Sequence, residues 1–189
     1  MDRDCPDPRQ RNGESGGAAV TVRMLSGAEA HATVPGLTDV LLDCVAGGAS
    51  VSFMAPLDRA TAEEFWRQVV AGVERGERIL LAAEDGEGVL GTVQLVVHQP
   101  PNQPHRADLS KMLVHRRARR RGVGALLMRA AEDAARAAGK TLLVLDTGSA
   151  DAERLYGRAG WTKVGVIPNY ALWPQGGFCD TTFFYKALG

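Results

Sequence analysis

The chain has 189 residues, and its 22 Lys and Arg residues are balanced by 22 Asp and Glu residues, so no global charge indicates nucleic acid or a membrane surface. With 45% hydrophobic and 23% charged residues, it has the composition of one ordinary globular domain with a sizeable core. Three scattered cysteines without C-x-x-C spacing argue against a disulfide framework or a zinc site, and no apolar run matches a membrane span or signal core, so we expect a cytoplasmic protein.

The chain opens with a polar stretch that is rich in Pro, Gly and Arg. This composition predicts a disordered leader over residues 1–18 and a single domain over residues 19–189. β-branched and apolar runs predict seven strands in that domain, at residues 20–25, 79–83, 89–97, 107–114, 141–145, 160–167 and 181–187. Apolar residues at helical spacing predict four helices, over residues 35–46, 61–74, 123–138 and 150–159. Loops are expected over residues 49–57, 99–105 and 169–177.

An arginine-rich turn joins the central strand to the longest amphipathic helix. Within it, Arg119, Gly122 and Gly124 form an R-x-x-G-x-G pattern directly before the helix. The first N–H groups of a helix lack intrahelical partners, and the macrodipole adds partial positive charge there. Glycines let the backbone close around a phosphate. The stretch therefore predicts a site for a pyrophosphate.

Other phosphate loops fit this stretch poorly. A P-loop needs Lys and Ser or Thr after its last glycine, whereas Gly124 is followed by Ala125 and Leu126. A dinucleotide fingerprint needs a glycine where Arg120 stands. A solvated basic turn or a nucleic-acid patch is the alternative for the run RRARRR, but neither requires the glycine spacing.

The pattern resembles the Q/R-x-x-G-x-G/A coenzyme A loop of the GNAT N-acetyltransferase superfamily. The order of predicted elements, β-α-α-β-β-β-α-β-α-β-β, and the R-x-G-W segment at residues 158–161 are also similar to that superfamily. The resemblance covers about residues 20–188. It implies an α/β fold of the GNAT type, in which helices flank a mixed, mostly antiparallel sheet and a parallel β-α-β unit binds coenzyme A.

Several stretches resemble the tabtoxin-resistance branch of this superfamily. They are GGASVSFMAPLD at residues 47–58, PNQPHRADLSKMLV at 101–114, LDT at 145–147 and TTFFYKAL at 181–188. This resemblance implies acetylation of an amino-acid-like toxin. One departure is that Asp108 stands where the family often has Glu at the start of the central strand, and the shorter carboxylate could need an extra water to reach an amine.

The resemblance also implies how acetyl-CoA is held. The pantetheine arm would pair with backbone of the central strand, and the phosphates would bind loop amides together with the side chains of Arg119 and Arg121. The predicted cofactor-binding residues are Met112, Leu113, Val114, Arg119, Arg120, Arg121, Gly122, Val123, Gly124 and Ala125.

Three side chains are candidates for the proton transfers. Asp146 follows a buried strand, where ligand-facing residues are common in α/β sheets, and Asp108 begins the central strand. By resemblance, both would act on the amine through ordered water, and Tyr156 would protonate the leaving thiolate. The alternatives are a helix cap for Asp146, a solvated strand start for Asp108 and a packing role for Tyr156.

Four residues in predicted loops could form a wall of the acceptor site: Phe53, Met54, Tyr170 and Trp173. Their alternative role is to seal an edge of the core. His31, His98 and His105 show no metal-ligand spacing, and we expect no metal.

Together these features predict an acetyl-CoA-dependent N-acetyltransferase that modifies a primary amine of a small molecule, with antibiotic resistance or detoxification as its setting. Acetylation of a protein N-terminus or lysine is the alternative among enzymes, and a non-catalytic coenzyme A-binding module is the alternative of another class. We expect no nucleic-acid or membrane partner, and a homodimer is expected from the resemblance.

Overall fold

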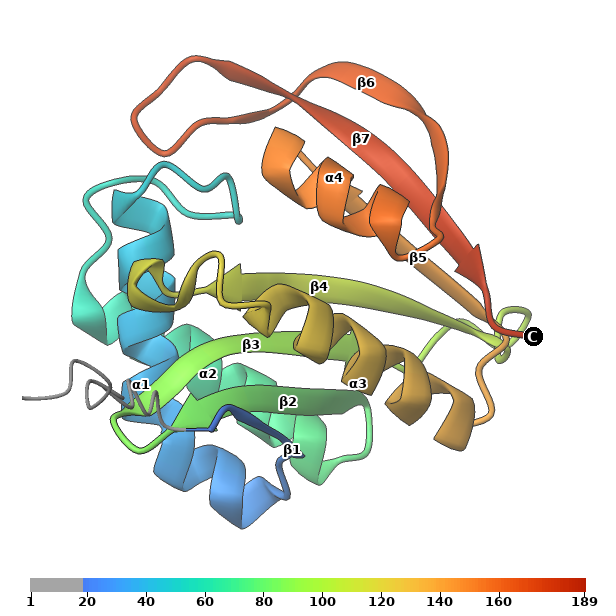
Figure 1. The fold of residues 1–189 in the computed structure, drawn as a ribbon, viewed down its shortest axis with the longest axis horizontal. Helices are drawn as coiled ribbons and strands as arrows, with labels where there is room; N and C mark the ends of the chain where they lie inside the picture. Colours follow the sequence, from blue (N-terminus) through green and yellow to red (C-terminus); the bar gives the residue numbers. More distant parts are fainter. Residues whose placement is uncertain (1–18) are drawn as a thin grey trace, which may run out of the picture.

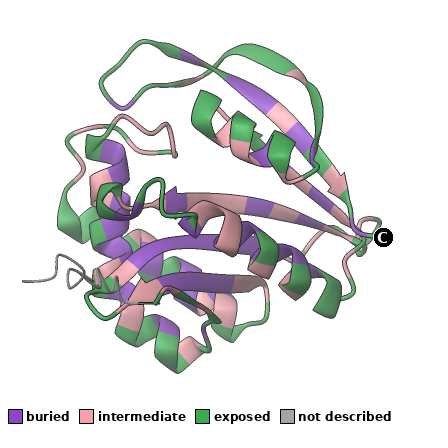
Figure 2. Cartoon of the chain, viewed as in Figure 1, coloured by how far each residue is buried: buried purple, intermediate pink, exposed green. Residues whose placement is uncertain are grey.

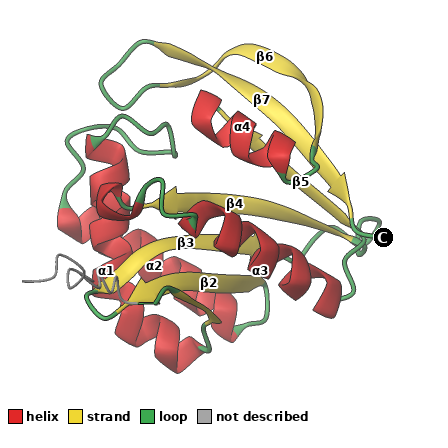
Figure 3. Cartoon of the chain, in the orientation of Figure 1, coloured by secondary structure: helices red, strands yellow, loops and turns green. Residues whose placement is uncertain are grey.

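The computed structural model describes residues 19–189, so the predicted leader lies outside the described residues. In this part of the chain one seven-stranded sheet has helices on both faces (Figures 1 and 3). The strand order is β1-β2-β3-β4-β5-β7-β6, and the only parallel pair within residues 19–189 is β4 with β5. The predicted α/β fold and order of elements are confirmed.

The strands are β1 (Thr21–Met24), β2 (Arg78–Asp85), β3 (Gly88–Val96), β4 (Arg106–Val114), β5 (Leu142–Thr147), β6 (Thr162–Leu172) and β7 (Phe178–Ala187). The helices are α1 (Gly27–Ala46), α2 (Arg59–Glu74), α3 (Val123–Ala137) and α4 (Ala150–Arg158), with a short 3-10 turn, η1 (Arg116–Ala118). No helix in this described part is long and apolar enough to cross a membrane.

The sheet separates two hydrophobic cores because successive side chains of a strand point to opposite faces. On β2, Leu81 and Ala83 belong to the core under α3 and α4, whereas Leu80 and Ala82 belong to the core under α1 and α2. The central strands are largely buried, but β6 is exposed along most of its length (Figure 2). The two faces thus support different layers, and each layer contributes to the site.

Helix α1 begins earlier than the sequence analysis predicted. Ser26 and Glu29 form a capping box, so the helix starts at Gly27 and contains Pro35, which the prediction placed at its N-terminus. The second helix is capped by Asp58, whose side chain accepts a hydrogen bond from the Thr61 amide at 2.9 Å. The capping signals, rather than the proline, therefore set the helix boundaries.

The C-terminal strands are longer than predicted. The predicted loop over residues 169–177 is wrong for its first four residues, because β6 continues to Leu172 through an irregular register between Ile167 and Ala171. Asn169 has a φ of 56° there, and its amide donates to the Asp180 carboxylate at 2.8 Å. Likewise β5 runs through Thr147, so Asp146 lies in the strand and not in the following turn.

Strands β4 and β5 pair over only three residues. Their register joins Arg106, Ala107 and Asp108 to the first residues of β5. Beyond Asp108, β4 pairs only with β3 as far as Val114, and β5 pairs only with β7 as far as Thr147. The facing edges of the two strands therefore carry unpaired backbone groups, and in Figure 1 the strands diverge toward their C-terminal ends.

Candidate active site

A bulge distorts β4 where it leaves β5. Thr92 lies opposite Leu113 and Gln94 lies opposite Ser110, so two residues of β4, Lys111 and Met112, oppose a single residue of β3. Lys111 adopts a φ of 50°, an uncommon conformation for a residue with a side chain. Such bulges bend a strand and redirect its side chains, and they are over-represented beside active sites.

Backbone amides converge where the loop over residues 119–122 enters α3. Arg120 and Gly122 both have left-handed backbone, with φ of 64° and 79°. Among the described residues no backbone acceptor bonds the amides of Arg120, Gly122, Val123 and Gly124, whereas those of Arg121 and Ala125 donate to carbonyls within the loop. Four of the six amides from Arg120 to Ala125 are thus available to a ligand.

This loop fits a pyrophosphate. Alternation of right- and left-handed backbone gathers N–H groups into an anion-binding concavity, and the α3 macrodipole adds partial positive charge. Gly124 has a packing role in the same place, because a Cβ there would lie 3.2 Å from the Leu155 side chain of α4. The loop and α4 therefore approach closely at Gly124.

The loop arginines are not equivalent. Arg116 pairs with Asp43, Arg117 with Asp85 and Glu87, and Arg121 with Asp85 at 3.4 Å. Within residues 19–189, neither Arg119 nor Arg120 is ion-paired with a carboxylate. Of the two predicted phosphate-binding side chains, Arg119 is therefore more available than Arg121.

Tyr156 lies in the core under α4. Its ring centroid is 5.8 Å from that of Trp161 and 5.6 Å from that of Phe184, and only 4% of the residue is exposed. Burial raises the pKa of the Tyr156 hydroxyl far above its ordinary value, and the nearby Asp146 carboxylate raises it further. The phenol is therefore protonated at neutral pH.

The two candidate carboxylates lie on the same face of the sheet. Asp108 pairs with Val144, and Asp146 is two residues further along β5, so both face the side covered by α1 and α2. The Asp146 carboxylate accepts a hydrogen bond from the Thr181 hydroxyl at 2.8 Å on one oxygen. The other Asp146 oxygen has no hydrogen-bond partner among the described residues.

Asp108 is engaged more fully. One oxygen pairs with Arg106 at 2.7 Å, and the other accepts a hydrogen bond from the Gln99 side chain at 3.1 Å. Both oxygens of Asp108 are therefore committed to neighbours, whereas Asp146 keeps one available.

Two loops close over this face and are joined by hydrogen bonds. The Ala55 amide donates to the Pro174 carbonyl at 2.8 Å, and the Ser50 hydroxyl donates to the Leu172 carbonyl at 3.0 Å. These bonds tie the loop before α2 to the hairpin between β6 and β7.

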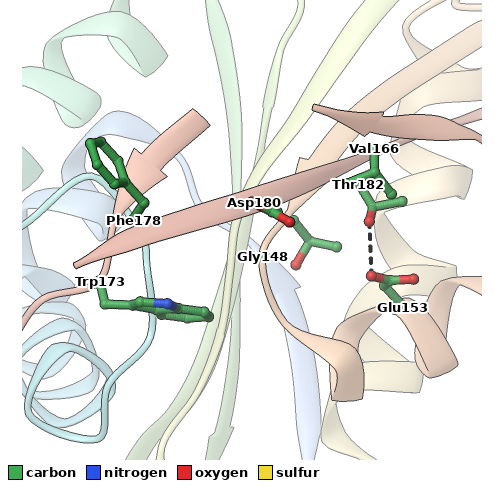
Figure 4. A pocket seen from close by; sticks show the side chains of 8 residues that line it. Gly148, Glu153, Val166, Trp173, Phe178, Asp180 and Thr182 are labelled. Carbon is green, nitrogen blue, oxygen red and sulfur yellow. Dashed lines mark hydrogen bonds between the residues drawn. The ribbon is translucent and has the colours of Figure 1, made fainter. Parts of the chain in front are cut away.

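The predicted wall residues separate into different places. Phe53 packs edge-on against Phe65 at 5.2 Å beside a hollow of about 460 Å³ along α2. Trp173 lines another pocket, of about 370 Å³, with Gly148 at the end of β5 and Asp180 on β7 (Figure 4). Tyr170 packs against Phe183 at 5.9 Å. Met54 is 48% exposed and lines neither hollow.

The sequence analysis missed a lysine at this site. Lys111 donates from Nζ to the Ser52 hydroxyl at 3.0 Å and lies 5.6 Å from the centre of the Phe65 ring. Its signal in the sequence is a lone charge within the apolar end of the central strand, Lys111 before Met112, Leu113 and Val114. Within residues 19–189 no group of three His, Cys, Asp or Glu side chains is arranged to hold a metal.

Three features together define a fold that binds an acyl-coenzyme A. They are a parallel strand pair that separates, a bulge at the point of separation, and a glycine loop whose amides are free. Residues 46–161 match the acetyltransferase (GNAT) family, and this match covers more than half of the chain. The chain belongs to that family. It is an N-acetyltransferase that takes its acetyl group from acetyl-CoA.

Solved structures share the fold. The ribosomal-protein-alanine N-acetyltransferase of Brucella melitensis has a TM-score of 0.76 and 22% identity, covering 89% of this chain and 99% of that one. A phosphinothricin acetyltransferase of Sinorhizobium meliloti, solved with acetyl-CoA, has a TM-score of 0.74 and 19% identity, covering 90% and 89%. The Salmonella typhimurium protein yncA, solved with its cofactor acetyl-CoA, has a TM-score of 0.72 and 20% identity, covering 91% and 95%.

Proposed function

We propose that the protein transfers acetyl directly to a primary amine of a small molecule. The observation that carries this proposal is that a partly free Asp146 carboxylate, on the strand that parts from β4, lies near enough to a buried, protonated Tyr156 to raise the pKa of its hydroxyl. The four free amides at residues 120–124 would hold the pyrophosphate, aided by Arg119, and the open edge of Met112 to Val114 would pair with the pantetheine arm.

Bound acetyl-CoA supplies an activated thioester. The amine nitrogen bonds to the acetyl carbon, the carbon–sulfur bond breaks, and one proton must leave the amine while one reaches the sulfur. Asp146 attracts the ammonium and takes its proton through a water, with Asp108 as a second, more constrained carboxylate. Tyr156 keeps its hydroxyl proton at neutral pH because it is buried, and it donates that proton to the sulfur as negative charge develops there.

The acceptor side favours a small molecule. The two joined loops bridge the face that Asp108 and Asp146 share, and the pocket of about 370 Å³ between Trp173 and the end of β5 has a volume in the range of small-molecule sites. A phosphinothricin acetyltransferase shares the fold, in agreement with the resistance role suggested by resemblance to the tabtoxin-resistance branch. A ribosomal-protein-alanine N-acetyltransferase shares it too, which keeps a protein N-terminus as the second candidate acceptor.

The first test is thiol release from acetyl-CoA against amino acids, amino-acid-like antibiotics, polyamines, aminoglycosides and N-terminal peptides, with the acetylated product identified by mass spectrometry. Turnover on a small amine and none on peptides is the expected result. Turnover on peptides alone would make the second candidate correct. Acetyl-CoA binding by calorimetry without any turnover would favour a non-catalytic module.

We also expect a cytoplasmic homodimer. β6 exposes Val164, Val166 and Ile167 at 67%, 51% and 45%, and apolar residues gathered on an edge strand are typical of a subunit interface. Light scattering after size exclusion measures the oligomeric state, and a monomer at micromolar concentration would contradict this expectation.

A further inference from the structure

Lys111 occupies a position that the transfer reaction leaves without a role. It stands in the β4 bulge and reaches the α1 and α2 side of the sheet, where its ammonium meets Ser52 and Phe65. This is the face that Asp108 and Asp146 share. The lysine therefore faces the region where an acceptor approaches Asp146.

The backbone is strained on both sides of this contact. Ser52 has a φ of 78° and Lys111 a φ of 50°, and a residue with a side chain pays a conformational cost in this region. The two residues are 59 positions apart, yet they meet through one 3.0 Å hydrogen bond. Strained residues that cluster in this way are typical of ligand sites.

Within residues 19–189 neither Lys111 nor Arg78 on this face forms a direct ion pair, although the Asp146 carboxylate lies near enough to act on Lys111. In the part of the chain that the structure describes, Lys111 has no ion pair, and the Arg78 guanidinium donates to the neutral Gln94 side chain at 2.8 Å. Burial lowers the pKa of Lys111, the Asp146 carboxylate offsets part of this effect, and Arg78 adds to it. A half-buried ammonium without a direct ion pair gains from an incoming anion.

We infer that Lys111, with the Ser52 hydroxyl and the charge of Arg78, binds a carboxylate of the acceptor, which makes the acceptor an amino acid or a close analogue. The inference rests on the proposed function and names its substrate class. Lys111 would hold the carboxylate while Asp146 attracts the ammonium of the same molecule. A zwitterion complements both charges, whereas a polyamine would meet an uncompensated cation at Lys111.

The kinetic test compares L-amino acids with their carboxamides, which keep the amine and remove the negative charge. In the unaltered enzyme we expect kcat/KM for the acids to exceed that for the amides by about 10- to 100-fold. Lys111→Met should abolish this ratio through KM, and Lys111→Arg should restore part of it. The inference is wrong if Lys111→Met lowers kcat/KM equally for acids and amides.

A binding test does not require turnover. N-acetylglycine carries the product amide and a carboxylate, and N-methylacetamide carries the amide alone. The Lys111 side-chain NMR resonance, assigned by its loss in Lys111→Met, should shift with N-acetylglycine and not with N-methylacetamide. Equal shifts, no shift, or acetylation of Lys111 itself by acetyl-CoA alone would overturn the inference.

The two proposals can fail separately. An enzyme that acetylates polyamines or aminoglycosides and no amino acid would uphold the proposed function and overturn the role of Lys111. A chain that acetylates nothing, yet binds N-acetylglycine through Lys111, would overturn the proposed function and support the anion site.

Discussion

The proposed coenzyme side and the proposed acceptor side of this molecule are built in different ways. On the coenzyme side, a contiguous stretch from Met112 to Gly124 supplies an open strand edge, a turn and a helix N-terminus. Its groups for a ligand are mainly backbone amides. On the acceptor side, Ser52, Lys111, Asp146 and Trp173 come from separate segments and contribute side chains.

This difference has a physical basis. Coenzyme A presents the same pyrophosphate and pantetheine to every enzyme that uses it, so backbone geometry is sufficient to recognise it. An acceptor is recognised by its shape and charge, which requires particular side chains placed by packing. Substitutions on the coenzyme side should therefore change the affinity for acetyl-CoA, and substitutions on the acceptor side should change acceptor turnover. Tyr156 lies between the two sides.

Tyr156→Phe should have the largest effect. The substitution removes only the hydroxyl from a ring that packs against Trp161 and Phe184, so the core should be retained. If the hydroxyl protonates the thiolate, kcat should fall by about 10²- to 10⁴-fold. Thiol release measures kcat, and calorimetry should give an unchanged Kd for acetyl-CoA. An unchanged kcat would reduce Tyr156 to a packing residue.

Asp146→Asn should have the next largest effect and should exceed that of Asp108→Asn in kcat. Asp146 has an oxygen available to a water, so its loss should lower kcat by about 10- to 100-fold. Asp108→Asn leaves Arg106 without its charge partner and should mainly reduce the free energy of unfolding. Urea unfolding and initial rates of both variants separate these effects, and the reverse ranking in kcat would make Asp108 the principal base.

The sequence predicts the local structure of the proposed coenzyme side well for the reason given above. The order of elements and the strand-turn-helix around Arg119 to Gly124 depend on local signals, namely apolar periodicity and glycine spacing. The same local reasoning placed the start of α1 too late, because the apolar spacing was followed only back to Pro35 and the capping box of Ser26 and Glu29 was missed.

The acceptor side could not be predicted in the same way. The bond from Ser50 to Leu172 joins residues 122 positions apart, and the contact of Lys111 with Ser52 depends on a bulge and two left-handed residues. No periodic pattern in the sequence predicts these long-range contacts. The sequence named Phe53 and Trp173, but only packing shows that they line different hollows.

Gly122→Ala should weaken acetyl-CoA binding by about 10-fold, because a Cβ opposes the left-handed backbone that directs the free amides. The matched control is Gly139→Ala, beyond the other end of α3. Both glycines have a positive φ, 79° and 70°, and a Cβ at either would meet nothing within 4 Å. Both variants should lose similar free energy of unfolding, and only Gly122→Ala should raise the Kd. Equal Kd values would remove the loop from the coenzyme site.

Arg119→Gln should weaken acetyl-CoA binding by roughly 3- to 10-fold, and Arg121→Gln by less. Arg121 already shares the Asp85 carboxylate with Arg117, whereas Arg119 has no ion pair among the described residues. Calorimetry at two salt concentrations tests this ranking, since the Arg119 contribution should diminish with added salt. A larger loss for Arg121→Gln would mean that Arg121 leaves Asp85 for the phosphates.

The smallest expected effect is on stability at alkaline pH. The pKa of Tyr156 is raised in the folded state, so between the ordinary tyrosine value of ~10 and the folded value the unfolded chain releases a proton that the folded protein keeps. The free energy of unfolding must therefore fall as pH rises above that ordinary value. From pH 8 to pH 10.5 the unaltered protein should lose roughly 0.8 kcal/mol more than Tyr156→Phe in urea unfolding. If the unaltered protein and Tyr156→Phe lost equal free energy of unfolding, solvent would reach the Tyr156 hydroxyl. Burial would then not keep that hydroxyl protonated.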